Sequence, residues 1–135
     1  MRLATWNCCG GPLLLKQAAI DKLAADVMVV PESPKPPAES TARLWFGEPD
    51  KKGLAVMAGP GVGLELVDVG VDLPRYVIPI QVRSARSFLL LAVWTQNDGD
   101  DRYVRGLVRA VDACESLISS QDTVIIVGAR RKLTI

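Results

Sequence analysis

Two polar side chains stand directly after short apolar segments near the start of the chain. Asn7 follows the β-prone segment 3–6, and Glu32 follows the apolar segment 27–30 and one proline. If a helix connects two parallel strands there, the ends of both strands meet at one edge of a sheet. A carboxylate beside an amide oxygen suits Mg²⁺, which keeps several waters and uses one or two protein carboxylates. The same residues also read as a turn former and a solvated loop residue, and spacing alone leaves both interpretations open.

The elements that would position this pair form a strand, a helix and a second strand. Segment 3–6 is stopped by two glycines and a proline, and segment 13–25 favours a helix. Segment 27–30 is apolar and too short for a helix, which predicts a buried strand. Four prolines within 31–40 predict a loop after it. The residues expected on the inward face of the helix are Leu14, Ala18 and Leu23.

The rest of the chain predicts a series of strands followed by one helix and one more strand. Five short apolar segments at close spacing favour an antiparallel meander; they are 44–46, 53–58, 64–69, 76–82 and 88–94. Apolar residues at every third or fourth position predict an amphipathic helix over 102–119; they are Tyr103, Leu107, Val111, Cys114 and Ile118. Segment 123–127 predicts a buried strand. The fold class is therefore α/β of the α+β type, with a mixed, mostly antiparallel sheet flanked by helices.

Composition limits the classes of protein to which the chain can belong. Lys and Arg number 16 against 15 Asp and Glu, a net charge of +1 that excludes a large field of one sign. The chain is 49% hydrophobic over 135 residues, which predicts one domain with a core. Its longest apolar run, 88–94, is far shorter than the ~18 residues of a membrane span. We expect a cytoplasmic protein without a membrane span.

Five segments in order resemble the endonuclease/exonuclease/phosphatase superfamily, which includes DNase I-like and exonuclease III-like enzymes. They are 3–7 (LATWN), 26–32 (DVMVVPE), 52–56 (KGLAV), 76–80 (YVIPI) and 91–97 (LAVWTQN), and the helix from Tyr103 follows. The resemblance covers 3–128 and implies about half of a four-layer α/β sandwich. Residues 1–128 would form the N-terminal part of the domain, and 129–135 a basic tail outside the family pattern. The implied function is a hydrolase of phosphodiesters or phosphomonoesters that depends on Mg²⁺ or Mn²⁺.

The resemblance also implies roles for four residues. Glu32 matches the acidic metal ligand of the family, and Asn7 matches an asparagine that organises the metal and the scissile phosphate. Asn97 lies near a polar position on the same loop as Trp94 and is expected among the catalytic residues. Trp94 stands where relatives often place His or Tyr beside the phosphate, and its indole can donate a hydrogen bond but cannot exchange a proton. An aromatic residue at the rim of the core is an equally good interpretation of Trp94. The implied partner is a phosphodiester substrate, with nucleic acid among the classes that the family cuts.

Two features depart from the family pattern. The last predicted strand normally runs into Gly-Asp-Phe-Asn, whereas Gly128 is followed here by Ala129, Arg130 and Arg131. The family also uses a Ser-Asp-His motif in a second half, and this chain contains no His. Losing one member of such a unit typically costs ~10³ to 10⁶ in rate. We therefore expect a truncated and poorly active member of the family, or alternatively a non-catalytic α/β module that acts by association.

The absence of a second half has a further consequence for folding. Each half of the family's sandwich covers the other, so one sheet face of this chain is expected to stay uncovered. Monomers seldom expose more than a few hundred Å² of contiguous apolar surface. We therefore expect self-association through this face.

Overall fold

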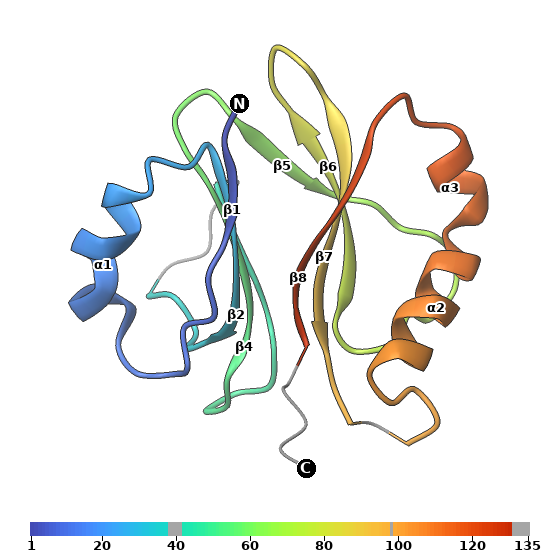
Figure 1. Cartoon of the computed structure of the whole chain (residues 1–135), viewed down its shortest axis with the longest axis horizontal. Coiled ribbons are helices and arrows are strands. Elements are labelled where there is room, and N and C mark those ends of the chain that lie inside the picture. Colours follow the sequence, from blue (N-terminus) through green and yellow to red (C-terminus); the bar gives the residue numbers. More distant parts are fainter. Residues whose placement is uncertain (38–41, 98, 131–135) are drawn as a thin grey trace.

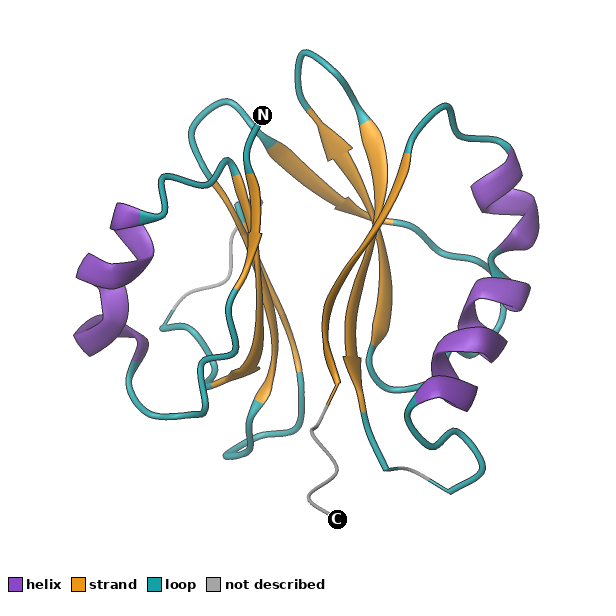
Figure 2. Ribbon diagram, in the orientation of Figure 1, coloured by secondary structure: helices purple, strands orange, loops and turns teal. Residues whose placement is uncertain are grey.

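A computed structural model describes residues 1–37, 42–97 and 99–130, which form two four-stranded sheets and three helices (Figure 1). The strands are β1 (Leu3–Thr5), β2 (Val27–Ser33), β3 (Arg43–Phe46), β4 (Gly53–Ala58), β5 (Gly63–Leu66), β6 (Val77–Arg83), β7 (Phe88–Thr95) and β8 (Val124–Arg130). The helices are α1 (Leu13–Lys22), α2 (Val104–Ala113) and α3 (Glu115–Ser119). Figure 2 shows the sheets as two inner layers with α1 outside one and α2 and α3 outside the other. The predicted α+β class is confirmed.

Each sheet contains one parallel pair of strands joined through helix. In the first sheet, with order β1-β2-β4-β3, β1 runs parallel to β2 and α1 connects them. In the second, with order β5-β6-β7-β8, β7 runs parallel to β8 and α2 and α3 connect them. The remaining pairs are antiparallel. The five strands expected as one meander are therefore divided between the two sheets.

The two sheets pack face to face around one apolar core. Its members alternate along the strands, because every second side chain points to the same face. Those that are 0% exposed are Val27 and Val29 of β2, Leu54 and Val56 of β4, Ile80 and Val82 of β6, and Leu90 and Ala92 of β7. Burying each Val or Leu contributes about 1.5–3 kcal/mol. The inner faces of the two sheets therefore cover each other within this chain. The expectation that one sheet face stays uncovered is wrong for these inner faces.

Helix α1 packs less closely than its apolar sequence predicts. It begins after Pro12 and contacts the outer face of the first sheet mainly through Ile20, which is 8% exposed. Leu14 and Leu15 are 84% and 81% exposed, so the expected inward face of Leu14, Ala18 and Leu23 is wrong. The apolar residues of this short helix are distributed around its whole circumference. Their spacing therefore does not single out one inward face.

The second connection also differs from its prediction. A break at Cys114 divides the expected helix into α2 and α3, and α2 approaches the sheet through Gly106 and Ala110. A Cβ at Gly106 would lie 2.5 Å from the carbonyl oxygen of Asp101, so only glycine lets the loop before α2 lie this close to the helix. No helix in the described part of the chain is long and apolar enough to cross a membrane.

Two boundaries are shifted relative to the sequence prediction. Strand β2 continues through Pro31 and Glu32 to Ser33, so the expected loop begins three residues later. Strand β8 continues through Gly128, and Ala129 and Arg130 pair with β7. The expected tail 129–135 therefore begins inside the sheet, while 131–135 lies outside the described residues.

Candidate active site

The segment after β1 remains attached to the end of β2. The backbone N–H of Trp6 donates to the carbonyl of Val29 at 3.1 Å, and that of Cys8 donates to Pro31 at 2.9 Å. The N–H of Gly10 then donates to the carbonyl of Glu32, also at 2.9 Å. These alternate hydrogen bonds extend the parallel pairing beyond the short strand β1. They hold Asn7 and Glu32 at neighbouring strand ends.

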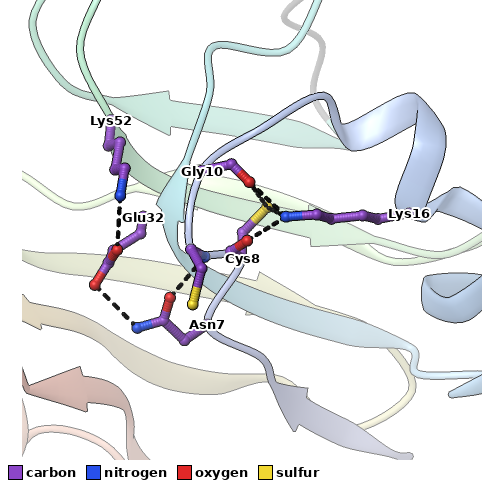
Figure 3. A network of polar contacts seen from close by, with 7 residues as sticks. Asn7, Cys8, Gly10, Lys16, Glu32 and Lys52 are labelled. Carbon is purple, nitrogen blue, oxygen red and sulfur yellow. Dashed lines mark hydrogen bonds and ion pairs between the residues drawn. The ribbon is translucent and has the colours of Figure 1, made fainter.

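The side chains of Asn7 and Glu32 are in contact, as the sequence predicts (Figure 3). Asn7 Nδ2 donates to Glu32 Oε1 at 3.2 Å, and Asn7 Oδ1 accepts the backbone N–H of Cys9 at 2.9 Å. The two partners fix the orientation of the amide, because a backbone N–H requires an oxygen and a carboxylate requires a donor. Asn7 therefore presents its NH₂ group, and not its oxygen, to the carboxylate.

The backbone at this edge adopts conformations that are uncommon for residues other than glycine. Glu32 has a φ of 57° and Cys9 a φ of 53°, both in the left-handed region. The register between β2 and β4 shifts between Val30 and Ser33, which places Glu32 inside a bulge. Bulges re-aim side chains, and strained residues cluster at functional sites. The local backbone strain therefore coincides with the predicted site.

Lys52 is the second partner of the carboxylate and was not among the residues predicted from sequence. Its Nζ lies 3.0 Å from Glu32 Oε2. The Lys52 side chain is 50% exposed and that of Glu32 is 19% exposed. The ion pair follows from strand pairing, since Gly53 of β4 is the register partner of Ser33 of β2. An ion pair with one half-exposed partner contributes about 0–1 kcal/mol and can open readily.

Lys16 of α1 holds the loop that carries Asn7. Its Nζ donates to the carbonyl oxygens of Cys8 and Gly10 and lies 3.5 Å from Cys8 Sγ (Figure 3). It also lies 5.8 Å from the centre of the Trp6 ring. A single ammonium thus joins the helix to the turn after β1. No motif in the sequence indicates this contact.

Two open hollows share Lys51, Lys52 and Tyr76 in their linings. Neither is lined by Asn7 or Glu32, and Lys52 is the residue through which both reach the carboxylate. The larger hollow, of about 920 Å³, is bounded by Trp45 and Phe46 among others. The smaller hollow, of about 440 Å³, is lined by Glu48, Lys51, Lys52, Arg75, Tyr76, Trp94, Gln96 and Asn97. Lys52 therefore connects the carboxylate with the hollow that contains the other two predicted site residues.

Trp94 and Asn97 occupy different environments within the smaller hollow. Trp94 is 9% exposed, belongs to the core and stacks on Tyr76 with ring centres 5.7 Å apart. Asn97 follows the end of β7 and is exposed. Trp94 is thus a core residue whose edge also borders the hollow. Its role toward a substrate, and that of Asn97, remain predictions.

An ion-paired cluster crosses from one sheet to the other at the rim of the smaller hollow. Glu48, between β3 and β4, contacts Lys51 and also Arg75, whose Nη1 lies 2.6 Å from Glu48 Oε1. The hydrogen bond from Lys51, followed by that from Arg75, lowers the pKa of the Glu48 carboxyl. Glu48 therefore stays ionised and pairs with two of the cations that line the hollow.

A divalent cation at this site would have one carboxylate, that of Glu32, as its protein ligand. Within 1–37, 42–97 and 99–130, no three His, Cys, Asp or Glu residues are grouped as a metal cage. Mg²⁺ requires no such cage, because it retains waters and is often held by one or two carboxylates and the substrate phosphate. Glu32 supplies the hard oxygen donor. Direct ligation by Asn7 would require its oxygen to leave the N–H of Cys9.

The end of β8 lacks the carboxylate that the resemblance implies. Ala129 is the register partner of Trp94 and is half-buried. The preceding Gly128 lies against β7 so closely that a Cβ there would be 1.7 Å from the carbonyl oxygen of Val93. Gly128 is thus needed for the close packing of β8 on β7, while position 129 carries only a methyl group.

No protein-family model matches the sequence, and no curated protein matches it significantly. The likeness to the endonuclease/exonuclease/phosphatase superfamily therefore rests on the five sequence segments. It remains a proposal, developed below.

Proposed function

We propose that the chain carries the cation-binding part of a metal-dependent phosphate ester hydrolase of the endonuclease/exonuclease/phosphatase superfamily. The observation that carries this proposal is the contact between Asn7 and Glu32 at the ends of two parallel strands. The bulged backbone at Glu32 and the adjacent cation-lined hollow support it. A sandwich with helices outside two sheets is the architecture that the resemblance implies.

Glu32 would hold Mg²⁺ or Mn²⁺, and Asn7 would fix the carboxylate by donating to Oε1. The bound ion would offset charge on a phosphate oxygen and acidify a water. Lys51, Lys52 and Arg75 provide a cationic lining for the phosphate of a phosphodiester substrate. Trp94 closes the wall of the hollow, and Asn97 offers an exposed amide at its rim.

The 135-residue chain is expected to hydrolyse its substrate slowly. Phosphate ester hydrolysis requires a base or carboxylate that positions water and a group that assists the leaving oxygen. Ala129 stands where the implied aspartate would be, and the chain contains no His. The residues present can bind and orient a cation and a phosphate but lack two groups of the implied catalytic unit.

Binding of Mn²⁺ to Glu32→Gln tests the cation site. Titration followed by the paramagnetic signal of free Mn²⁺ should show one site in the wild type and at least about tenfold weaker binding in the variant, equivalent to about 1.4 kcal/mol. Glu48→Gln is the matched control, because Glu48 lies on the rim of the smaller hollow but not at the strand ends. Equal affinity of the wild type and Glu32→Gln would refute the proposal.

Hydrolysis of bis(p-nitrophenyl) phosphate separates the enzyme from the non-catalytic alternative. We expect slow turnover that requires Mg²⁺ and is lost in Glu32→Gln. The absence of any turnover, together with intact Mn²⁺ binding, would favour a non-catalytic module that acts by association. That alternative is favoured by one observation, the apolar residue at position 129.

A further inference from the structure

The ammonium of Lys52 lies against the carboxylate of Glu32, which is the group proposed to bind the divalent cation. Its ammonium lies 3.0 Å from Oε2, while the other carboxylate oxygen accepts from Asn7 (Figure 3). A divalent cation and an ammonium cannot share this oxygen without strong repulsion, since both are positive. Loading of the proposed site therefore requires Lys52 to move.

The backbone next to Lys52 is closely packed at Gly53, whereas the side chain of Lys52 extends to the surface. Gly53 is buried beside β3, and a Cβ there would lie 2.4 Å from the carbonyl oxygen of Phe46. The side chain of Lys52 is half-exposed, and its four-carbon stem has several rotamers of similar energy. The ammonium can therefore change position through a change of rotamer.

The smaller hollow provides a destination for the displaced ammonium. Lys52 lines this hollow together with Lys51 and Arg75, and Glu48 is paired with both of those cations. The charge of Lys52 is instead balanced by Glu32. When a cation takes over Glu32, the charge of Lys52 becomes available to an anion in the hollow. Phosphate oxygens meet the chemistry of this lining.

We propose that Lys52 has two positions: it neutralises Glu32 when no cation is bound, and it binds phosphate oxygens of the substrate when a divalent cation occupies Glu32. This inference rests on the proposed cation site. It makes Lys52 both a competitor of the cation and a ligand of the phosphate. The binding of cation and phosphate is thereby coupled through one side chain.

Mn²⁺ affinity provides the first test and does not depend on activity. Lys52→Gln removes the competing charge, so it should bind Mn²⁺ about three- to tenfold more tightly than the wild type. Lys51→Gln is the matched control, because Lys51 lines both hollows but pairs with Glu48. Its Mn²⁺ affinity should equal that of the wild type. Equal affinities of the wild type and Lys52→Gln, or the same gain in both variants, would overturn the inference.

Binding of inorganic phosphate, measured by calorimetry with and without Mg²⁺, provides the second test. Mg²⁺ should strengthen phosphate binding by the wild type more than by Lys52→Gln, and Lys52→Arg should restore the wild-type gain. An equal gain in the wild type and in Lys52→Gln would contradict the second position of Lys52. If Glu32→Gln binds Mn²⁺ like the wild type, the cation site itself is refuted, and this inference with it. If Glu32→Gln loses Mn²⁺ and Lys52→Gln changes nothing, only the role of Lys52 is refuted.

Discussion

The two parallel strand pairs have the same topology but different residue types at the ends of their strands. Both β1–β2 and β7–β8 are joined through helix on the outside of the sandwich. The first pair ends in an amide and a carboxylate in contact, Asn7 and Glu32. The second ends in the core aromatic Trp94 and in Ala129. Topology thus places strand ends together, and the residue types at those ends decide whether they can do chemistry.

The pairs also differ in how closely the connecting helices pack on the strands. Every residue of β7 is buried, and α2 approaches it through Gly106 and Ala110. In the first pair, α1 has only Ile20 buried, and the ends of the strands are held by the Lys16 ammonium and by a bulge. The second pair therefore has a helix packed on it through small residues, while the first carries the strained polar site. This division is common, because strained sites require support from the surrounding structure.

The largest effect is expected from closing the space between the tightly packed strands. Gly128→Ala places a Cβ 1.7 Å from the Val93 carbonyl oxygen, so β7 and β8 must separate. We expect a loss of more than about 3 kcal/mol in the free energy of unfolding, measured with urea. Gly63→Ala is the control, because its Cβ meets only the Arg83 side chain at an ordinary 3.5 Å. Similar losses in both variants would show that the close approach of β8 to β7 at Gly128 does not determine the loss.

A smaller effect, on Mn²⁺ affinity, is expected from adding a carboxylate to the end of the second strand pair. Ala129→Asp adds a carboxylate at the end of β8, beside Trp94. Strand β8 contacts β2 across the sandwich, so we expect Mn²⁺ affinity to rise about tenfold. Ala129→Asn, which is similar in size but neutral, should produce little gain. No difference between the two variants would show that the ends of the two pairs act independently.

The smallest effect concerns the ion pair between the sheets. The pKa of Glu48 is lowered in the folded state, chiefly by its hydrogen bond to Lys51 and next by that to Arg75. Its contribution to stability is therefore present above its ordinary pKa and is lost as pH falls through the lowered value. Wild type should lose slightly more stability than Glu48→Gln when acidified below about pH 4.5. If the melting temperatures of the two proteins fall equally from pH 6 to pH 3, the stabilising role of the Glu48 ion pairs is contradicted.

Much of the first pair could be predicted because its signals are local. The β-prone segment before Asn7, the glycines and proline that stop it, and the buried segment before Glu32 define a strand, a helix and a strand. Their order requires the strand ends to be neighbours, and the contact of 3.2 Å confirms this. The inward face of α1 could not be predicted, because Leu14 and Leu15 are as apolar as the buried Ile20.

Local sequence therefore specified the strands, their connection by helix and the polar pair at their ends, since propensity and spacing act over a few residues. Long-range pairing decided the rest. The insertion of β4 beside β2 brought Lys52 to Glu32, and the division of the strands into two sheets gave each inner face its cover. These contacts depend on which strands pair in the folded chain, and no local connection sets that pairing. The physical reason is that the free energy of such contacts belongs to the packed whole and leaves no periodic signal in any one segment.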